Sequence, residues 1–219
     1  MRIPVANAGR DCLIGVFGFG RYSFFQTERQ PPSHYEAIMA KNLVLIGFMG
    51  TGKSTAGRQC ARILDRPFLD TDALLVERAG KPIPQIFAED GEAAFRKWEC
   101  RIVAEVAGQG DKVISTGGGA MLNPDNARVI RASSCVVLLT AKTFAIMRRV
   151  GDRRNRPMLA NVSDPYSHVV ELCAKRSPFY ELSADALVDT TDRLVDEVVQ
   201  EILAWYGQIT ARQANHEEV

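Results

Sequence analysis

The glycine-rich stretch GFMGTGKST at residues 47–55 constrains the fold of this chain more than any other part of its sequence. It matches the phosphate-binding pattern G-x-x-x-x-G-K-[ST] at every fixed position. The apolar segment 42–46 before it is typical of a buried parallel strand. Apolar residues after it recur at helical spacing: Ala56, Cys60, Ile63 and Leu64. A strand, a loop and a helix are therefore predicted in the order that builds a cradle of backbone N–H groups.

This cradle predicts a site for a nucleoside triphosphate and Mg²⁺. Its glycines allow backbone N–H groups to turn inward without clashes from a Cβ atom. Lys53 would reach the outer phosphates, and the hydroxyl of Ser54 would ligate Mg²⁺. The predicted nucleotide contacts in this stretch are Gly50, Thr51, Gly52, Lys53, Ser54 and Thr55.

From residue 41 onward, short apolar runs alternate with helical patterns. Further strands are predicted at 67–70, 112–116, 135–139 and 186–188. The clearest helical face carries Phe95, Trp98, Ile102 and Val106. Other helices are predicted through Leu74, Leu75 and Ala79 up to Gly80, through Ile83, Ile86 and Phe87 up to Gly91, through Phe144, Ile146 and Met147, and through Leu194, Val198, Ile202 and Trp205. Strands that alternate with helices predict an α/β fold, with a parallel sheet covered by helices on both faces.

The two ends of the chain differ from this regular part. Residues 1–40 are predicted to be a poorly ordered N-terminal extension, and residues 207–219 a loose polar C-terminal tail. The folded domain is expected over residues 41–206.

Composition excludes several classes of function. A formal net charge of +1 argues against a large electrostatic surface for nucleic acid or an anionic membrane. No apolar run approaches the length that crosses a bilayer. The five cysteines are scattered and form no C-x-x-C pair, which favours buried or idle thiols in a reducing compartment.

An acidic stretch at 70–72 follows the second predicted strand. Ligands of parallel α/β sheets lie beyond the carboxyl ends of the strands, so both carboxylates are expected to face the phosphate site. Asp70 could hold Mg²⁺ through a water, and Asp72 could take the proton of an acceptor hydroxyl. Alternatively, Asp72 only caps the next helix.

Arginines and glycines downstream suggest an anionic acceptor. Arg96 and Arg176, each near an expected helix end, could bind a carboxylate bidentately or could form surface salt bridges. The run Gly117, Gly118 and Gly119 follows a strand, where either a tight turn or close approach of backbone to a ligand is expected. The arginine-rich segment 151–165 is either an exposed basic loop or a mobile lid over the transferred phosphoryl group.

Residues 41–206 resemble the shikimate kinase family, which uses ATP to phosphorylate the 3-hydroxyl of shikimate in the aromatic amino-acid pathway. The phosphate loop alone is widely shared, but the order and separation of the other motifs are specific. These motifs are Asp70-Thr71-Asp72, Gly80 with Ile83 and Ile86-Phe87, Gly91-Glu92 with Phe95-Arg96 and Glu99, Ser115 to Gly119, Arg156-Pro157-Met158-Leu159 and Arg176 to Tyr180.

The resemblance implies a P-loop NTPase-type fold, a five-stranded parallel sheet of order 2-3-1-4-5 with a mobile lid. It implies a cytosolic monomer that takes ATP, Mg²⁺ and shikimate and binds neither nucleic acid nor membrane. By this resemblance, Lys53 would stabilise the phosphoryl group, Ser54 would bind Mg²⁺ with Asp70 in the outer shell, and Asp72 would act as the base. Arg96, Arg176 and Gly117 to Gly119 would bind shikimate. Arg156 would close the lid, and Arg149 would contact the adenine.

Parts of this pattern are shared with other classes of protein. A gluconate kinase or nucleoside monophosphate kinase shares the loop, but a gluconate kinase should lack the paired arginines and the triple glycine. A regulatory module that kept the fold and lost turnover should have lost Asp72 or the lid arginine. Nucleic-acid binding by the arginine-rich segment is disfavoured, because that segment has no interleaved aromatic residues.

Overall fold

The computed structural model describes residues 42–150, 159 and 162–217, all within the unit Pro32–Val219. Its strands form one parallel sheet of order β2-β3-β1-β4-β5 in the described residues, which confirms the predicted fold class and strand order. The strands are β1 (Asn42–Ile46), β2 (Phe68–Asp70), β3 (Val113–Ser115), β4 (Ser134–Thr140) and β5 (Ala186–Asp189). Each predicted strand is present, with ends shifted by one residue or fewer.

The sheet is buried on both faces because side chains of each central strand alternate between two cores. In β1, Leu43 and Leu45 join one apolar cluster while Val44 and Ile46 join the other. All four side chains are fully buried. The continuous apolar run of β1 is therefore a property of a strand with helices on both sides.

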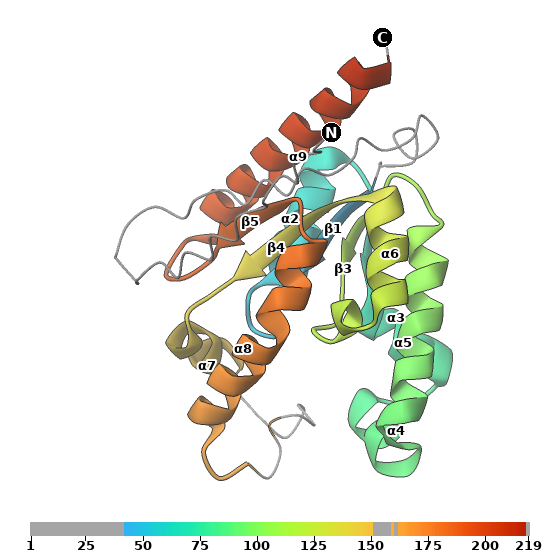
Figure 1. Ribbon diagram of the computed structural model, residues 1–219, viewed down its shortest axis with the longest axis vertical. Helices are drawn as coiled ribbons and strands as arrows, with labels where there is room; N and C mark the ends of the chain where they lie inside the picture. Colours follow the sequence, from blue (N-terminus) through green and yellow to red (C-terminus); the bar gives the residue numbers. More distant parts are fainter. Residues whose placement is uncertain (1–41, 151–158, 160–161, 218–219) are drawn as a thin grey trace, which may run out of the picture. The chain divides into compact units, whose positions relative to one another are not determined.

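Helices cover the two faces unequally (Figure 1). One cluster contains side chains of α2 (Lys53–Leu64) and α9 (Val195–Glu217). The other contains side chains of α3 (Thr71–Ala79), α4 (Ile83–Glu89), α5 (Gly91–Ala107), the short 3₁₀ helix η1 (Ala120–Leu122), α6 (Pro124–Ser133), α7 (Thr143–Val150) and α8 (Pro165–Ser183).

Two expectations about the last helix were wrong, namely its end before residue 207 and the inclusion of Leu194. Residues 207–217 continue α9 instead of forming a loose tail, because no glycine or proline interrupts them after Gly207 and Thr210 returns a hydrogen bond to the Tyr206 carbonyl. The predicted helix after the phosphate loop is confirmed as α2, which buries its small residues and leaves Ile63 53% exposed. Leu194 is 72% exposed and precedes α9.

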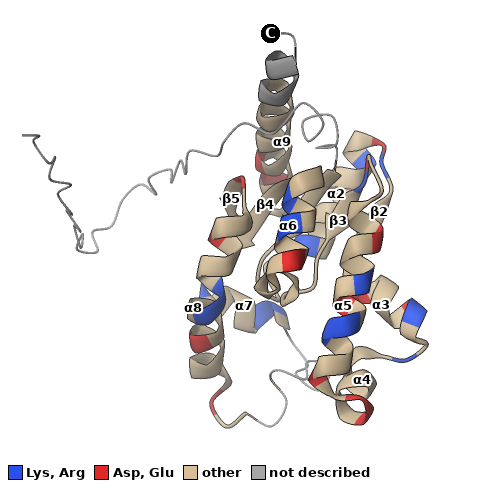
Figure 2. Cartoon of the chain, turned by 45° about the vertical axis from the view of Figure 1, so that its right-hand side comes forward, with Lys and Arg blue, Asp and Glu red and all other residues tan. Residues whose placement is uncertain are grey.

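Basic and acidic residues lie along the same helices, for example along α5 and α6 (Figure 2). Among the described residues, no helix is both long and apolar enough to span a bilayer. The predicted extension 1–40 and Arg156 of the predicted lid lie outside the described residues. Of the segment 151–165, the buried Leu159 and residues 162–165 are described, and Pro165 already begins α8.

Candidate active site

The phosphate loop joins the carboxyl end of β1 to the start of α2. Gly47 has a φ of 133°, and a Cβ atom there would lie 2.2 Å from the Leu139 carbonyl oxygen of β4. Gly52 is the N-cap of α2 with a φ of 93°, a left-handed conformation that favours glycine. Both positions therefore require glycine, one because the backbone passes close to the neighbouring strand and one because of the turn into the helix.

Lys53 lies in the loop with its side chain buried. Its Nζ donates to the carbonyl oxygens of Gly47 at 2.9 Å and of Phe48 at 2.8 Å. The hydroxyl of Thr51 donates to the same Phe48 carbonyl at 2.8 Å. These bonds place a positive charge inside the loop, where an anionic phosphate would be attracted.

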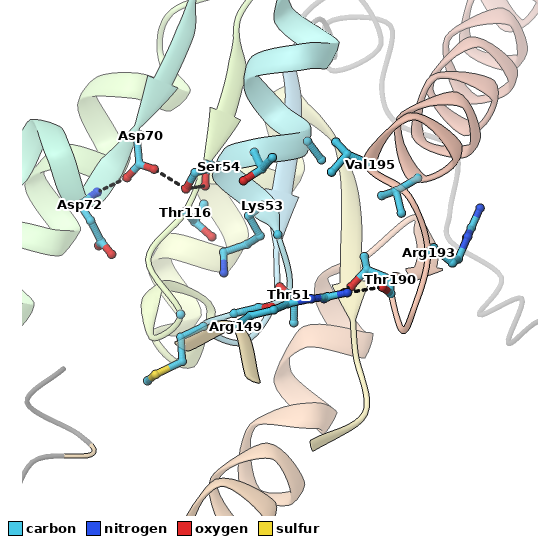
Figure 3. A pocket seen from close by; sticks show the side chains of 18 residues that line it. Thr51, Lys53, Ser54, Asp70, Asp72, Thr116, Arg149, Thr190, Arg193 and Val195 are labelled. Carbon is cyan, nitrogen blue, oxygen red and sulfur yellow. Dashed lines mark hydrogen bonds between the residues drawn. The ribbon is translucent and has the colours of Figure 1, made fainter. Parts of the chain in front are cut away.

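Oxygen atoms from three elements meet beside the loop. Ser54 Oγ donates to Asp70 Oδ2 at 2.6 Å and lies 3.3 Å from Ser115 Oγ (Figure 3). Ser54 lies in the first turn of α2, Asp70 ends β2 and Ser115 ends β3. Hydroxyl and carboxylate oxygens are the ligands that Mg²⁺ prefers, and Mg²⁺ often keeps several waters. The donor set therefore fits the predicted metal.

Asp70 also caps α3. Its Oδ1 accepts hydrogen bonds from the backbone N–H of Asp72 at 3.1 Å and of Ala73 at 3.3 Å. The alternative that Asp72 only caps this helix is therefore wrong, because Asp70 has that role. The Asp72 side chain instead lies against Gly117, where a Cβ atom would come within 2.5 Å of Asp72 Oδ1.

The turn of Gly117, Gly118 and Gly119 lies between the side chains of both predicted arginines. A Cβ atom on Gly119 would lie 2.2 Å from Arg96 Nη1. The Gly118 carbonyl accepts a hydrogen bond from Arg176 Nη1 at 3.2 Å. Gly118 and Gly119 form a turn, as the first alternative expected, while approach of a ligand to this backbone stays a prediction.

Arg96 is held by two carboxylates of its own helix. Its Nη1 donates to Glu99 at 2.8 Å, and its Nη2 donates to Glu92 at 3.0 Å. Burial raises the pKa of Glu99, and the charge of Arg96 opposes that shift. Glu99 is 3% exposed, and its Oε1 has no hydrogen-bond partner within the described part of the chain. The spacing of three residues between Arg96 and Glu99 could have predicted this pair.

Arg176 is buried within α8. Its guanidinium carbon lies 5.4 Å from the centroid of the Phe48 ring, so it contacts the phosphate loop as well as Gly118. The expectation that Arg96 and Arg176 lie near helix ends was wrong, since α5 and α8 each continue well beyond them in both directions. Both arginines instead face inward from the body of a helix toward the glycine turn.

Arg149 contacts the phosphate loop from α7. Its Nη1 donates to Thr190 Oγ1 at 2.9 Å and to the Gly50 carbonyl at 3.4 Å. Thr190, Arg193 and Val195 line the same pocket, near the end of β5 and the start of α9. Nothing in the sequence pattern singled out these three residues, because they lie on a short connection without a motif.

The phosphate loop, the carboxyl ends of β2 and β3, and Arg149 line one cavity of about 450 Å³ (Figure 3). Asp72, Gly118, Lys53, Ser54 and Arg149 all belong to its lining. Arg96 and Arg176 do not line it, but they contact the glycine turn that does. The phosphate-binding loop and the Asp72 carboxylate thus line the same cavity.

Comparison with known proteins decides the family. A family model described as shikimate kinase matches residues 49–206, more than two thirds of the chain. The chain belongs to the shikimate kinase family. It is therefore a kinase, and family membership favours shikimate kinase over a gluconate kinase or a nucleoside monophosphate kinase.

Relatives of the shikimate kinase family support this membership. A shikimate kinase from Caldanaerobacter subterraneus subsp. tengcongensis is 40% identical over 172 residues, covering 78% of this chain and 99% of that protein. The structure of shikimate kinase from Acinetobacter baumannii in complex with shikimate matches with a TM-score of 0.73 and 32% identity, covering 78% of this chain and 95% of that one. A gluconokinase from Sinorhizobium meliloti 1021 has a TM-score of 0.53 at 16% identity, covering 81% of this chain and 98% of that one, and so shares only the fold.

Gly119→Ala is expected to reduce kcat/KM about 10- to 100-fold, because the new methyl group displaces the Arg96 guanidinium. The displaced guanidinium also holds the buried Glu99 carboxylate, so a lower melting temperature is expected as well. Gly110→Ala is the matched control, since a Cβ atom at Gly110 meets nothing within 4 Å. Equal kinetics of the two variants, measured by release of ADP, would contradict this contact.

Proposed function

We propose that this chain transfers the γ-phosphoryl group of ATP to the 3-hydroxyl of shikimate, giving shikimate 3-phosphate and ADP. The observation that carries the proposal is the common cavity of Lys53 and Asp72. Arg96 and Arg176, which would bind the acceptor, contact the glycine turn beside this cavity. A phosphate donor and a hydroxyl acceptor would therefore meet between the loop and Asp72.

The acceptor would be oriented by its carboxylate. Arg96 and Arg176 approach the glycine turn from α5 and α8, so a carboxylate beside this turn could contact both guanidinium groups. The backbone of Gly118 would lie against the ring of the acceptor. Anchoring the acid in this way directs a hydroxyl of the same molecule toward Asp72 and the loop.

Asp72 would act as the general base. Its carboxylate takes the proton of the 3-hydroxyl as that oxygen bonds to the γ-phosphorus, and the bond from the γ-phosphorus to the bridging oxygen of ADP breaks. Lys53 is already buried in the loop and would neutralise charge on the moving phosphoryl group. Arg156, in the predicted lid, would add a second positive charge and help to exclude water, which is a competing acceptor.

Mg²⁺ would be held by Ser54 directly and by Asp70 through a water, consistent with the short contact between these residues. When bound, the ion neutralises phosphate charge and orients the triphosphate. Arg149, together with Thr190, Arg193 and Val195, would hold the adenine end of the nucleotide at the other side of the cavity.

Further properties of the protein belong to the same proposal. We expect a cytoplasmic monomer that binds neither nucleic acid nor membrane. The support is the net charge of +1, the mixed charges along single helices and the thiols of Cys60, Cys100 and Cys173, which form no disulfide among the described residues.

The decisive test is a coupled assay of ADP release with Mg-ATP across shikimate, quinate, gluconate and nucleoside monophosphates. Shikimate is expected to give the highest kcat/KM by a wide margin. A higher value for gluconate or a nucleotide would overturn the proposed acceptor. ATP binding without turnover on any acceptor would instead support the alternative of a regulatory module.

A further inference from the structure

Two side chains on one face of α8 converge on a single backbone atom. Arg176 and Tyr180 are one helical turn apart, and they are only 6% and 4% exposed. Arg176 Nη1 and the Tyr180 hydroxyl both donate to the carbonyl oxygen of Gly118. A carbonyl oxygen has two lone pairs, so these two donors use its full capacity as an acceptor.

The Gly118 carbonyl belongs to a turn that also touches the phosphate loop. A Cβ atom on Gly118 would lie 3.5 Å from the Met49 amide nitrogen and 3.6 Å from the Gly47 carbonyl oxygen. Arg176 itself lies over the Phe48 ring of that loop. A hydrogen bond that fixes Gly118 therefore fixes the position of the turn between α8 and the nucleotide site.

Tyr180 does not contribute to the lining of the cavity. Burial raises the pKa of its hydroxyl to about 12, with the neighbouring Arg176 opposing that shift. The hydroxyl therefore stays protonated, and remains a donor, throughout the pH range in which kinases are assayed. Its ring packs in the larger apolar cluster, so the hydroxyl is held from a rigid part of the core.

We propose that Tyr180 is a positioning residue for the acceptor, which holds the Gly118 carbonyl and thereby sets the orientation of the Arg176 guanidinium toward the substrate carboxylate. This inference rests on the proposed function, because it assumes an anionic acceptor bound by Arg176. Without the hydroxyl, the Gly118 carbonyl keeps only Arg176 as a donor. The guanidinium is then drawn toward the backbone and away from the substrate.

The test is Tyr180→Phe in the full-length enzyme, which removes the hydroxyl and keeps the ring in the core. The KM for shikimate is expected to rise about tenfold, in line with loss of one buried hydrogen bond. The kcat and the KM for ATP should stay within about twofold of the parent enzyme. Tyr166→Phe is the matched control, because Tyr166 lies on the same helix and is 51% exposed.

A double-mutant cycle separates positioning from simple packing. In an Arg176→Lys background, Tyr180→Phe should add little further increase in the KM for shikimate, because its target is already altered. Fully additive effects would overturn the inference, as would an unchanged KM for shikimate in Tyr180→Phe. A variant that fails to fold, or one that loses kcat at constant KM, would assign the hydroxyl to stability and also overturn it.

Failure of the proposed function gives a different result. If the parent enzyme does not phosphorylate shikimate, the proposed function fails and the role of Tyr180 fails with it. If the parent enzyme is active and Tyr180→Phe matches it in every constant, only the inference about Tyr180 is wrong.

Discussion

Asp72→Asn is expected to reduce kcat by about 10² to 10⁴-fold while ATP binding survives, because an amide of the same shape cannot take a proton. The substitution should spare the fold, since the cap of α3 comes from Asp70. Steady-state ADP release gives the loss in kcat, and titration with ATP in the absence of acceptor gives the nucleotide affinity.

The matched control for this variant is Asp125→Asn. Asp125 is also an acid in the first turn of a helix, but it lies on α6 and is exposed to solvent. It should keep parental kinetics. Full activity of Asp72→Asn would remove Asp72 from the role of base, whereas lost ATP binding would indicate that the variant damages the phosphate loop.

Arg96→Lys is expected to raise the KM for shikimate by about 10² to 10³-fold, equivalent to a few kcal/mol, because lysine cannot bind a carboxylate bidentately. The structure adds a second reason. Arg96 uses separate nitrogens for Glu99 and Glu92, and the compact ammonium of lysine lacks the planar fork that spans two such partners.

Arg101→Lys on the same helix serves as the control, because the Arg101 guanidinium packs on Trp98 at the surface, away from the glycine turn. Its KM for shikimate should equal that of the parent. An unchanged KM for shikimate in Arg96→Lys would reject the assignment of Arg96 to the acceptor carboxylate.

The strands were predictable because buried strands of a parallel sheet have a simple sequence pattern. One helix, α6, was not predicted, and α8 was expected only as a helix that ends near Arg176. α6 starts with the cap residue Asn123 and then Pro124, a local signal that could have been used. α8 buries Arg176 while it exposes Phe179 and Leu182, so its apolar residues do not mark its inner face.

In the site, the phosphate loop was predictable from its motif, but the neighbours of each side chain were not. The register of β2 against β3 places Asp70 opposite Ser115, and this pairing brings both to Ser54. The spacing of residues along the sequence does not reveal which residues of β2 and β3 lie opposite each other. The burial of Glu99 beside Arg96 likewise depends on how α5 packs against the glycine turn.

The small residues of α2 have a consequence for nucleotide recognition. At Gly57 a Cβ atom would come within 2.6 Å of the Phe68 ring, so the helix axis can lie this near to the sheet only without a side chain there. The same helix carries Lys53 and Ser54 at its first turn. Gly57 is not among the residues that line the cavity, so a larger residue there is expected to move Lys53 and Ser54 away from the strands and to change ATP affinity without a change in the lining itself.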